Sequence, residues 1–594
     1  MSVAHARLAP ALAVGAFLVL ALTSAASHSG TFDEGVYVSA GYAGWRFGDF
    51  RVNTTHPPLA KLLAAAPLLL LDVRADPQDG AFLEAHSWKL ARRFVYEWNE
   101  PRRLLFWARA AVALLAASLV LLVWAWARRH WGSAAGSLAL LLAALSPDLL
   151  AHGSLATTDL PVTALAFASV VAFERLLEGP SAWRVLATGA ALGGALLSKH
   201  TALLLLPLLF ALGVADALAR GLPLRRSLPR MLALLALCAA IAYGVLWAGY
   251  GFRYAAAADP AHTEPLVWRA GGAGLRDSRL LPEAYVHGLF DLFARSQDRR
   301  AFLLGQHSSE GWWYYFPVTF LLKTPLPLLA LLAVALLRAP ASLARRAAFL
   351  WLPAAAFGLA ALASSVDIGH RYLLPMHPFL IVAAASAAPV LLERGRRGRS
   401  LLLLLCAWYA AGTALNHPHH LAYFNELAGG PSQGYRWLAD SNVDWGQDLI
   451  RLKRYMEEQR LPSVKLSYFG TAPPEAYGIR HELLPSMMRP FPERLSLLVR
   501  PGDVVVVSAT NLQGVYLPRP ARRLMERFKE QQPIARVGRS LFVYRAEFGW
   551  LLRPELAQEL GWLDDAMAAY REALRLDPSD ATARAYLEQA EGLR

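Results

Sequence analysis

Apolar runs of about 20 residues recur along the chain from residue 8 to about residue 415, and they constrain the fold more than any other feature. A run of this length crosses the hydrocarbon core of a bilayer as one α-helix. We therefore predict an α-helical polytopic membrane protein with about eleven transmembrane helices. The predicted spans lie near residues 8–26, 104–127, 132–151, 160–178, 183–199, 201–218, 231–250, 313–337, 346–364, 372–391 and 400–415.

The first apolar run also has features of a secretory signal peptide, because Arg7 precedes it and small residues follow it at 24–26. We expect it to be retained as the first span, since the later spans need no separate signal.

Charged residues make up 18% of the chain, which is less than the share of about 25% in soluble proteins, but charge returns after residue 416. The predicted domains are a transmembrane domain at 1–415, a small α/β domain at 416–548 and a helical repeat at 549–594.

Lysines and arginines are distributed unevenly among the loops, and the net charge of the chain is +14. A basic balance can indicate nucleic-acid binding. Here the excess lies in alternate short loops, which is the positive-inside pattern of membrane proteins. We therefore expect no nucleic-acid partner, a cytoplasmic N-terminus, outer loops at 27–103 and 251–312, and an outward tail. The expected cytoplasmic arginines are Arg128, Arg129, Arg175, Arg184, Arg220, Arg225, Arg226, Arg230, Arg338, Arg345, Arg346, Arg394, Arg396, Arg397 and Arg399.

The tail has shorter apolar segments, which predict a small α/β unit over residues 440–548. Its expected elements are a helix at 448–459 and strands at 464–469, 503–508 and 540–544. The stretch from Leu560 to Pro578 is similar to part of one tetratricopeptide repeat, a pattern of about 34 residues. A single repeat buries its own apolar face poorly. It is therefore either a helical hairpin packed on the preceding domain or a surface for a protein partner.

Two adjacent acids, Asp33 and Glu34, directly follow the first predicted span. Charged groups next to a membrane span are costly unless they lie in a watery or paired site. Carboxylates suit the activation of a hydroxyl group, so this pair is a candidate catalytic site. The alternative is that the two acids form a solvated helix cap.

The same loop continues with a proline-containing motif, Asn53-Thr54-Thr55-His56-Pro57-Pro58-Leu59-Ala60-Lys61. The prolines fix the backbone and place His56 just before the start of a helix. Lys61 would lie about one turn into that helix. A cation beside a helix N-terminus favours anion binding. The alternative for His56 is a turn residue that is hydrogen-bonded to the backbone.

A second outer connection runs from Asp148 to Asp159, which directly precedes an apolar helix. The predicted topology brings Asp159 to the same side of the membrane as Asp33. Asp159 is also a candidate helix N-cap, and Asp148 is the weaker functional candidate of the two.

Four basic or imidazole side chains, from Lys199, Lys323, His370 and Arg371, are expected on the outer side of the predicted bundle. Lys323 lies inside a span and must snorkel or face a cavity. Arg371 has the forked geometry that suits phosphate, although Arg371 and Lys323 could instead contact lipid headgroups. Acids and cations on one face suit a substrate that combines a sugar, a phosphate and an apolar tail.

These segments resemble the motifs of protein O-mannosyltransferases and their bacterial relatives, including the aminoarabinose transferases that modify lipid A. Those proteins are membrane glycosyltransferases of the GT-C fold. The resemblance covers roughly residues 10–550. It is carried by Asp33-Glu34, His56-Pro57-Pro58-Leu59-Ala60-Lys61, Thr158-Asp159-Leu160-Pro161, Ser198-Lys199, Trp313-Tyr314-Tyr315-Phe316-Pro317, Lys323-Thr324-Pro325, Gly369-His370-Arg371-Tyr372-Leu373-Leu374-Pro375 and Ser441-Asn442-Val443-Asp444-Trp445-Gly446-Gln447-Asp448.

The resemblance implies an outward-facing active site in a bacterial inner membrane and a polyprenyl-phosphate sugar donor. It also implies an inverting transfer to a hydroxyl of a protein or an envelope glycolipid. Asp33 would be the catalytic base, with Glu34 and Asp159 supporting the site. The lipid phosphate leaves as an anion and needs cations rather than a general acid. The expected donor-phosphate ligands are His56, Lys61, Lys199, Lys323, His370 and Arg371.

One position departs from the aminoarabinose branch, in which a lysine precedes the paired prolines, whereas this chain has His56 there. Details of the acceptor in that branch therefore do not transfer. The terminal repeat also lies outside the usual pattern of the family, so its role stays open.

This chemistry requires no cofactor, and we expect no metal centre. The histidines within residues 416–420 offer imidazole ligands for a divalent ion, but a membrane-surface loop is the favoured interpretation. Cys238 and Cys406 lie inside apolar runs and support neither a disulfide framework nor a thiolate site.

Two other functions fit parts of the pattern. A transporter or lipid flippase would use the same charges to bind its cargo, but no internal repeat of the kind common in transporters is evident. An assembly scaffold acting through the terminal repeat would leave the membrane acids without a role.

Overall fold

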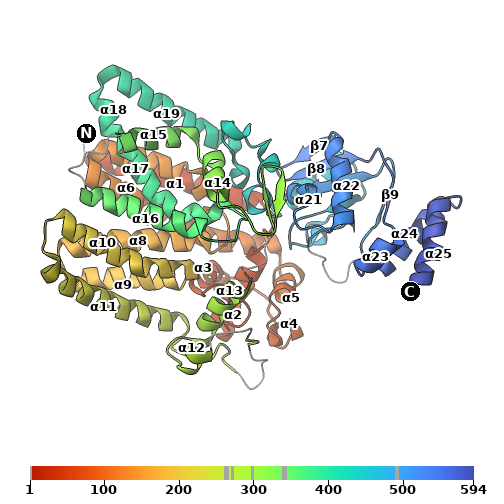
Figure 1. Cartoon of the computed structure of the whole chain (residues 1–594), viewed down its shortest axis with the longest axis horizontal. Helices are drawn as coiled ribbons and strands as arrows, with labels where there is room; N and C mark the ends of the chain where they lie inside the picture. The colour runs from red at the N-terminus through yellow and green to blue at the C-terminus, as the bar shows by residue number, and fades with distance from the viewer. Residues whose placement is uncertain (1–2, 260–265, 269–272, 296–299, 338–343, 488–493) are drawn as a thin grey trace. The chain divides into compact units, whose positions relative to one another are not determined.

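The computed structural model describes residues 3–259, 266–268, 273–295, 300–337, 344–487 and 494–594 (Figure 1). Contacts divide the chain into two compact units. The membrane unit comprises Met1–Ser27, Asp33–Arg299 and Glu310–Gly430. The tail unit comprises His28–Phe32, Arg300–Ser309 and Pro431–Arg594, so it includes both the predicted α/β domain and the terminal helices.

All regular structure that is described in the membrane unit is helical. Its apolar core includes Trp126, Phe167 and Phe379, whose rings pack edge to face. The helices in its predicted spans are α1 (Val3–Ser27), α6 (Pro101–Ala144), α8 (Asp159–Glu178), α9 (Ala182–Leu196), α10 (Leu205–Ala219), α11 (Leu224–Gly249), α14 (Tyr315–Lys323), α15 (Leu326–Leu337), α16 (Ala344–Leu362), α17 (His377–Ala385), α18 (Ala387–Glu393) and α19 (Gly395–Asn416). Figure 1 shows α8, α9, α10 and α11 side by side.

The other described helices of this unit lie between the predicted spans or follow the last one. They are α2 (Glu34–Phe47), α3 (Leu59–Ala65), η1 (Ala66–Leu70), α4 (Gly80–Leu83), α5 (Ser87–Ala91), η2 (Arg92–Glu97), α7 (Pro147–Gly153), η3 (His200–Leu204), α12 (Ala273–Asp277), α13 (Glu283–Arg295), η6 (His370–Met376), η7 (His420–Ala422) and η8 (Glu426–Ala428).

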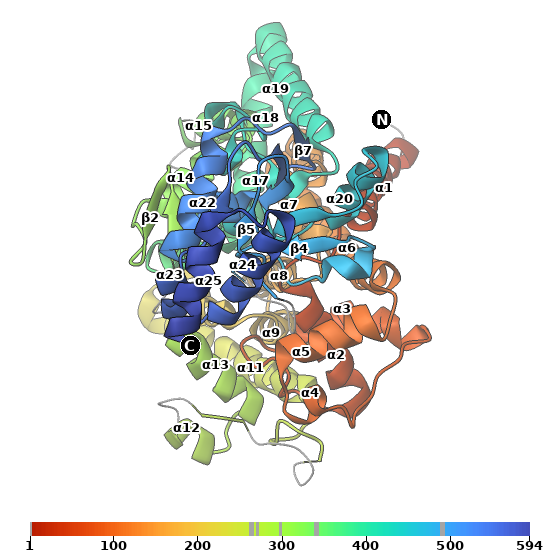
Figure 2. The ribbon, with the colours of Figure 1, turned by 90° about the vertical axis from the view of Figure 1, so that its right-hand side faces the viewer.

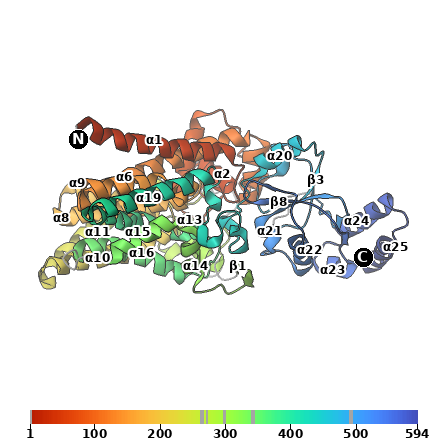
Figure 3. The same ribbon diagram turned by 90° about the horizontal axis from the view of Figure 1, so that it is seen from above.

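Helix α6 is a hairpin rather than one rod. Gly132 has φ 80° and ψ −174°, which no helix contains, and a glycine adopts this backbone without a Cβ clash. A Cβ added at Gly136 would lie 2.6 Å from the Cβ of Arg128, although eight residues of straight helix rise about 12 Å. The chain therefore folds back, as the predicted spans at 104–127 and 132–151 require. Figure 3 shows α1 running along α6.

Seven of the described helices are long and apolar enough to cross a bilayer, or eight if the bent pair α14 and α15 is one span. Helix α6 is counted once among the seven, although it contains two predicted spans. The predicted spans at 183–199 and 346–364 correspond to α9 and α16, which lie outside the seven. The helical polytopic fold is confirmed, whereas the predicted number of about eleven spans is not reached by length and composition alone.

The tail unit contains a five-stranded sheet with the order β4-β3-β6-β8-β7. Strands β4, β3 and β6 are parallel to one another, and β8 is antiparallel to both β6 and β7. The predicted helix and three strands correspond to α20, β3, β6 and β8, whereas β4 and β7 were not predicted. The elements are β3 (Val464–Ser467), β4 (His481–Leu483), β6 (Val504–Ser508), β7 (Ala535–Val537), β8 (Leu541–Arg545), α20 (Leu449–Glu458), α21 (Ala509–Gln513) and α22 (Arg519–Glu530).

Smaller elements complete the tail unit. They are the hairpin of β1 (Ala301–Leu303) and β2 (Gln306–Ser308), the pair of β5 (Leu498–Val499) and β9 (Trp550–Leu551), and the short helices η9 (Gly434–Arg436), η10 (Asp440–Asn442) and η11 (Pro474–Tyr477).

Three helices end the tail unit: α23 (Pro554–Glu559), α24 (Leu563–Leu576) and α25 (Ala581–Leu593). Figure 2 shows α24 and α25 side by side, as a helical hairpin requires. Their apolar face shares one core with Leu483, Leu495 and Leu497 of the preceding domain. This packing agrees with a hairpin docked on the α/β domain, and the similarity to a tetratricopeptide repeat stays a prediction.

The tail motif noted in the sequence is a buried scaffold for the residues that lead into Asp33. The amide of Ser29 donates to the carbonyl of Gln447 at 3.0 Å, and the amide of Phe32 donates to the carbonyl of Trp445 at 2.9 Å. These bonds lie within the tail unit. Because Asp33 is the next residue after Phe32, the backbone just before this acid is fixed by the motif.

Asp444 of this motif gives the tail unit a predicted dependence on pH. Its carboxylate is fully buried and accepts hydrogen bonds from the amides of Thr510 (3.0 Å) and Gly446 (3.3 Å). Burial outweighs these bonds and raises the pKa of Asp444 to about 7. A raised carboxyl pKa stabilises the fold below its unfolded value of about 4, and that stabilisation is lost as the pH rises through about 7.

We therefore expect the thermal unfolding midpoint of the full chain to fall between pH 5.5 and pH 8.5. The Asp444→Asn variant should lack this part of the fall, because an amide does not titrate. The measurement is thermal unfolding in detergent across that range. Equal slopes with pH in both proteins would contradict the assignment.

Candidate active site

Asp33 and Asp159 both lie near the guanidinium group of Arg371. One terminal nitrogen of Arg371 lies 3.4 Å from Oδ2 of Asp33 and 3.5 Å from Oδ2 of Asp159. Lys199 Nζ donates to the other oxygen of Asp159 at 2.6 Å. Both cations also lie near the face of the Tyr372 ring, at 4.8 Å for Lys199 and 5.4 Å for Arg371. We call Asp33, Asp159, Lys199 and Arg371 the acid–cation group.

Neither acid of this group serves as a side-chain helix cap. Asp33 holds the N-cap position of α2, but its side chain makes no capping hydrogen bond. Asp159 is the first residue of α8, whose N-cap is Thr158. Asp33 and Asp159 nevertheless lie at helix N-termini, where the helix dipole favours negative charge. Helix α2 begins directly after Asp33, and helix α8 begins at Asp159. The helix starts therefore fix the backbone position of both acids.

Glu34 has a different environment from its neighbour Asp33. Arg109 from α6 binds both of its carboxylate oxygens, with Nε–Oε1 at 2.8 Å and the second nitrogen at 2.6 Å from Oε2. The amide of Ala156 donates to Oε1 at 2.8 Å, and Arg109 also donates to the carbonyl of Ala25 at 2.7 Å. Both side chains are buried. This bidentate pair therefore joins the end of α1, the start of α2, α6 and the loop before α8.

Lys61 and His56 hold the proline-containing loop together. Lys61 Nζ donates to the carbonyls of His56 (2.7 Å) and Asn53. The His56 ring lies edge-on to Tyr37, with centroids 5.8 Å apart. Burial, followed by the charge of Lys199, lowers the pKa of His56 well below its usual value. His56 is therefore neutral near pH 7 and offers a hydrogen bond rather than a positive charge.

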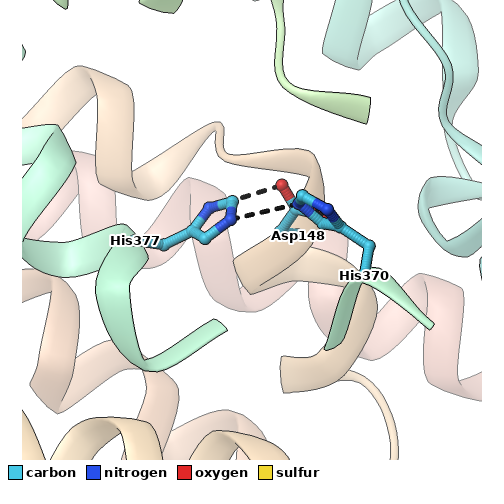
Figure 4. A group of neighbouring side chains, drawn as sticks. All are labelled: Asp148, His370 and His377. Carbon is cyan, nitrogen blue, oxygen red and sulfur yellow. Dashed lines mark hydrogen bonds and ion pairs between the residues drawn. The ribbon is translucent and has the colours of Figure 1, made fainter. Parts of the chain in front are cut away.

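Lys323 and His370, which were predicted as phosphate ligands, belong to a second group. His370 Nε2 lies 3.1 Å from His377 Nε2 and 3.7 Å from Oδ1 of Asp148. Lys323 Nζ donates to the carbonyl of Leu421 at 2.9 Å. Figure 4 shows the side chains of Asp148, His370 and His377 pointing toward one another. We call these three residues the Asp–His–His cluster.

His152 of α7 lies within electrostatic range of both groups. Burial lowers the pKa of His152 to about 4, and the charges of Asp159, Arg371, Lys323 and His377 also act on this pKa. The two groups are therefore neighbours in the membrane unit, and a neutral imidazole lies near both.

The sequence pattern did not reveal the importance of several residues of these groups. Arg109 and His377 lie inside predicted apolar spans and were not singled out, and Asp148 was ranked as weak. An ionisable residue within a membrane span is costly unless it is paired or faces a polar site. That rule was the available signal for Arg109 and His377, but it does not reveal the partner.

Comparisons with known proteins agree with the predicted resemblance over part of the chain. The family model described as dolichyl-phosphate-mannose-protein mannosyltransferase matches residues 104–247. This segment contains Arg109, Asp148, Asp159 and Lys199. A comparison with curated protein sequences found no match.

Solved structures with a similar chain course include ArnT from Cupriavidus metallidurans and an oligosaccharyltransferase from Archaeoglobus fulgidus. Apo ArnT has a TM-score of 0.46 and 14% identity, covering 92% of this chain and 99% of that chain. ArnT bound to undecaprenyl phosphate has a TM-score of 0.45 and 14% identity, covering 90% and 98%. The oligosaccharyltransferase tethered to an acceptor peptide has a TM-score of 0.40 and 13% identity, covering 80% and 64%.

The fold and the family match together define the class. The chain is an α-helical polytopic membrane protein, and its residues 104–247 are similar to the mannosyltransferase family named above. The predicted resemblance to membrane glycosyltransferases is confirmed for that segment.

Proposed function

We propose that this chain is a glycosyltransferase that moves a sugar from a polyprenyl-phosphate donor to an acceptor hydroxyl at the outer face of the membrane. The observation that carries the proposal is the acid–cation group, in which Asp33 and Asp159 share Arg371 while Lys199 binds Asp159. The match of residues 104–247 to a mannosyltransferase family supports it. The donor sugar is a hexose or pentose, and the acceptor is a protein or an envelope glycolipid.

The proposed step is one displacement at the anomeric carbon. Asp33 takes the proton of the acceptor hydroxyl as its oxygen forms the new bond to that carbon. The bond from the anomeric carbon to the phosphate oxygen breaks, and its electron pair leaves with the polyprenyl phosphate. Attack and departure on opposite faces invert the configuration.

Exposure supports Asp33 rather than Asp159 as the base. The Asp33 side chain is 21% exposed, whereas that of Asp159 is 2% exposed and binds both Lys199 and Arg371. An acceptor hydroxyl must reach the base within hydrogen-bond distance. Asp159 therefore suits the role of holding the two cations, which would stabilise the charge that develops on the leaving phosphate.

One assay separates this function from the two alternatives. The purified protein in nanodiscs is incubated with polyprenyl-phosphate hexoses and pentoses and with an envelope lipid or protein fraction. A transferase releases free polyprenyl phosphate and forms a glycosylated product. A flippase moves the intact donor across the membrane without cleavage, and a scaffold neither moves nor cleaves it. If the protein releases no polyprenyl phosphate from any of the donors, the proposal is refuted.

The proposal requires the first outer loop and the tail to lie outside the cell, and we expect a cytoplasmic N-terminus in a bacterial inner membrane. The alternation of arginine-rich loops supports this orientation. Reporter fusions after Arg129 and Arg226 should be cytoplasmic, and a fusion after Arg594 should be extracytoplasmic. A cytoplasmic reporter at Arg594 would contradict the predicted topology.

Arg371→Ala is expected to weaken donor binding by about 1.5–3 kcal/mol, which is the usual cost of losing a hydrogen bond to a charged group. Lys61→Ala should weaken it too, in part because Lys61 holds the His56 loop. Binding of polyprenyl phosphate to each purified variant is the measurement. Lys89→Ala, at an exposed lysine of the first outer loop, is the matched control and should bind as the wild type does. Wild-type affinity in both Arg371 and Lys61 variants would remove these residues from the donor site.

A further inference from the structure

The Asp–His–His cluster joins three different elements of the membrane unit. Asp148 is in α7, His370 begins η6 and His377 begins α17. One ligand atom from each residue can be chosen so that all lie within 4.8 Å of one another, and all three residues are buried. His370 Nε2 lies 3.1 Å from His377 Nε2 and 3.7 Å from Oδ1 of Asp148, and the other ring nitrogen of His377, Nδ1, lies 3.5 Å from Oδ2 of Asp148 (Figure 4).

We propose that Asp148, His370 and His377 bind one divalent first-row metal ion, with zinc as the best fit. Two imidazoles and one carboxylate form a ligand set that suits zinc and iron. Ligand atoms at about 2.0–2.1 Å around a tetrahedral zinc ion lie about 3.3 Å apart. His370 Nε2 lies near this spacing from both His377 Nε2 (3.1 Å) and Asp148 Oδ1 (3.7 Å), and one ligand atom from each residue lies within 4.8 Å of the others, so side-chain rotations would bring three ligand atoms to one ion. Three protein ligands leave a fourth position for water, as in open zinc sites.

Hydrogen bonding alone does not satisfy this cluster. Oδ2 of Asp148 is buried and has no hydrogen-bond partner in the described part of the chain. The 3.1 Å contact between the two imidazoles needs one ring nitrogen as donor and the other as acceptor. A metal ion would use a lone pair from each of the three side chains and would neutralise the buried carboxylate, whose isolation is otherwise costly.

Lys323 is the competing counter-charge for Asp148. Its ammonium group is positioned by the carbonyl of Leu421 at 2.9 Å and lies 4.7 Å from the centre of the Phe424 ring. Its positive charge also acts on the carboxylate of Asp148. If Lys323 alone balances Asp148, the cluster will hold no metal, and the experiment below distinguishes the two cases.

A bound ion would fix η6, because His370 and His377 flank this short helix and Asp148 anchors it to α7. Arg371 directly follows His370 and reaches Asp33 and Asp159. The metal would therefore act at a distance from the reacting atoms by holding Arg371 in place. The metal site itself is independent of the proposed transferase function, since its test measures binding.

The test uses the purified full chain in detergent, stripped with a chelator and then loaded with excess Zn²⁺ or Co²⁺ and desalted. We expect about one Zn²⁺ per chain by mass spectrometry, and visible d–d absorption bands of Co²⁺ that are lost on adding Zn²⁺. Less than a tenth of an ion per chain, with no Co²⁺ bands, would overturn the proposal and favour Lys323 as the counter-charge.

Variants assign the ion to this cluster. His377→Phe and Asp148→Asn should each lower the Zn²⁺ content at least tenfold. The matched control is His417→Phe, because His417 and His420 form a similar imidazole contact at 3.2 Å without a carboxylate in the cluster. Retained Zn²⁺ in the His377 and Asp148 variants, or its loss only in the His417 variant, would place the ion elsewhere. Because variants can misfold, only monodisperse fractions are compared, and the Co²⁺ spectrum of the wild type remains an independent readout.

Discussion

Replacing Asp33 by Asn is expected to lower the rate of sugar transfer about 10²–10⁴-fold, which is the usual contribution of a general base. The amide keeps the shape of the side chain but cannot accept the proton of the acceptor hydroxyl. Arg371 lies 3.4 Å from Asp33 and still contacts Asp159 in this variant, so donor binding should be largely retained. The measurement is single-turnover transfer in nanodiscs, with donor affinity determined separately.

Two further acids give this experiment its controls. Asp72→Asn makes the same chemical change at an exposed position of the first outer loop and should transfer at the wild-type rate. Asp159→Asn should lower the rate of sugar transfer less than Asp33→Asn does, if Asp159 orients the cations rather than taking the proton. Wild-type transfer by Asp33→Asn would place the base elsewhere.

Arg109→Met is expected to destabilise the membrane unit by about 3–5 kcal/mol, the usual cost of leaving one partner of a buried ion pair uncompensated. Both carboxylate oxygens of Glu34 are bound by Arg109, and neither side chain is more than 1% exposed. Methionine fills part of the arginine volume but leaves the Glu34 carboxylate without its cation. The thermal unfolding midpoint and the yield of monodisperse protein should both fall.

The double variant Arg109→Met with Glu34→Gln separates charge from packing. It removes both charges, so it should recover a large part of the lost stability. The matched control is Arg129→Met, which breaks a partly exposed ion pair with Glu178 and should cost about 1 kcal/mol or less. If Arg109→Met and Arg129→Met have the same effect, the Glu34–Arg109 pair does not organise the site.

Most of the secondary structure was predictable, because it depends on local pattern. The apolar runs correspond to helices, and the three predicted strands of the tail correspond to β3, β6 and β8. Strands β4 and β7 were missed since each has only three residues at an edge of the sheet. Three residues are too few for an alternating pattern to stand out from its surroundings.

The candidate site was predictable in its residue types and only partly in its groupings. Asp33, Asp159, Lys199 and Arg371 were predicted on one side and lie together. Lys323 and His370 were placed in the same phosphate site from sequence. In the structure they instead lie with Asp148 and His377.

The sequence by itself determined that this is a polytopic helical membrane protein, and it predicted that its unusual charges gather on one side of the helical bundle. Both follow from the cost of placing polar groups in a bilayer, which acts on every local segment. Only the tertiary structure decided which charge pairs with which. Arg371 and Asp33 are 338 positions apart, and Arg109 and Glu34 are 75 apart. Such contacts depend on how helices pack, and packing is set by the whole fold rather than by any local pattern.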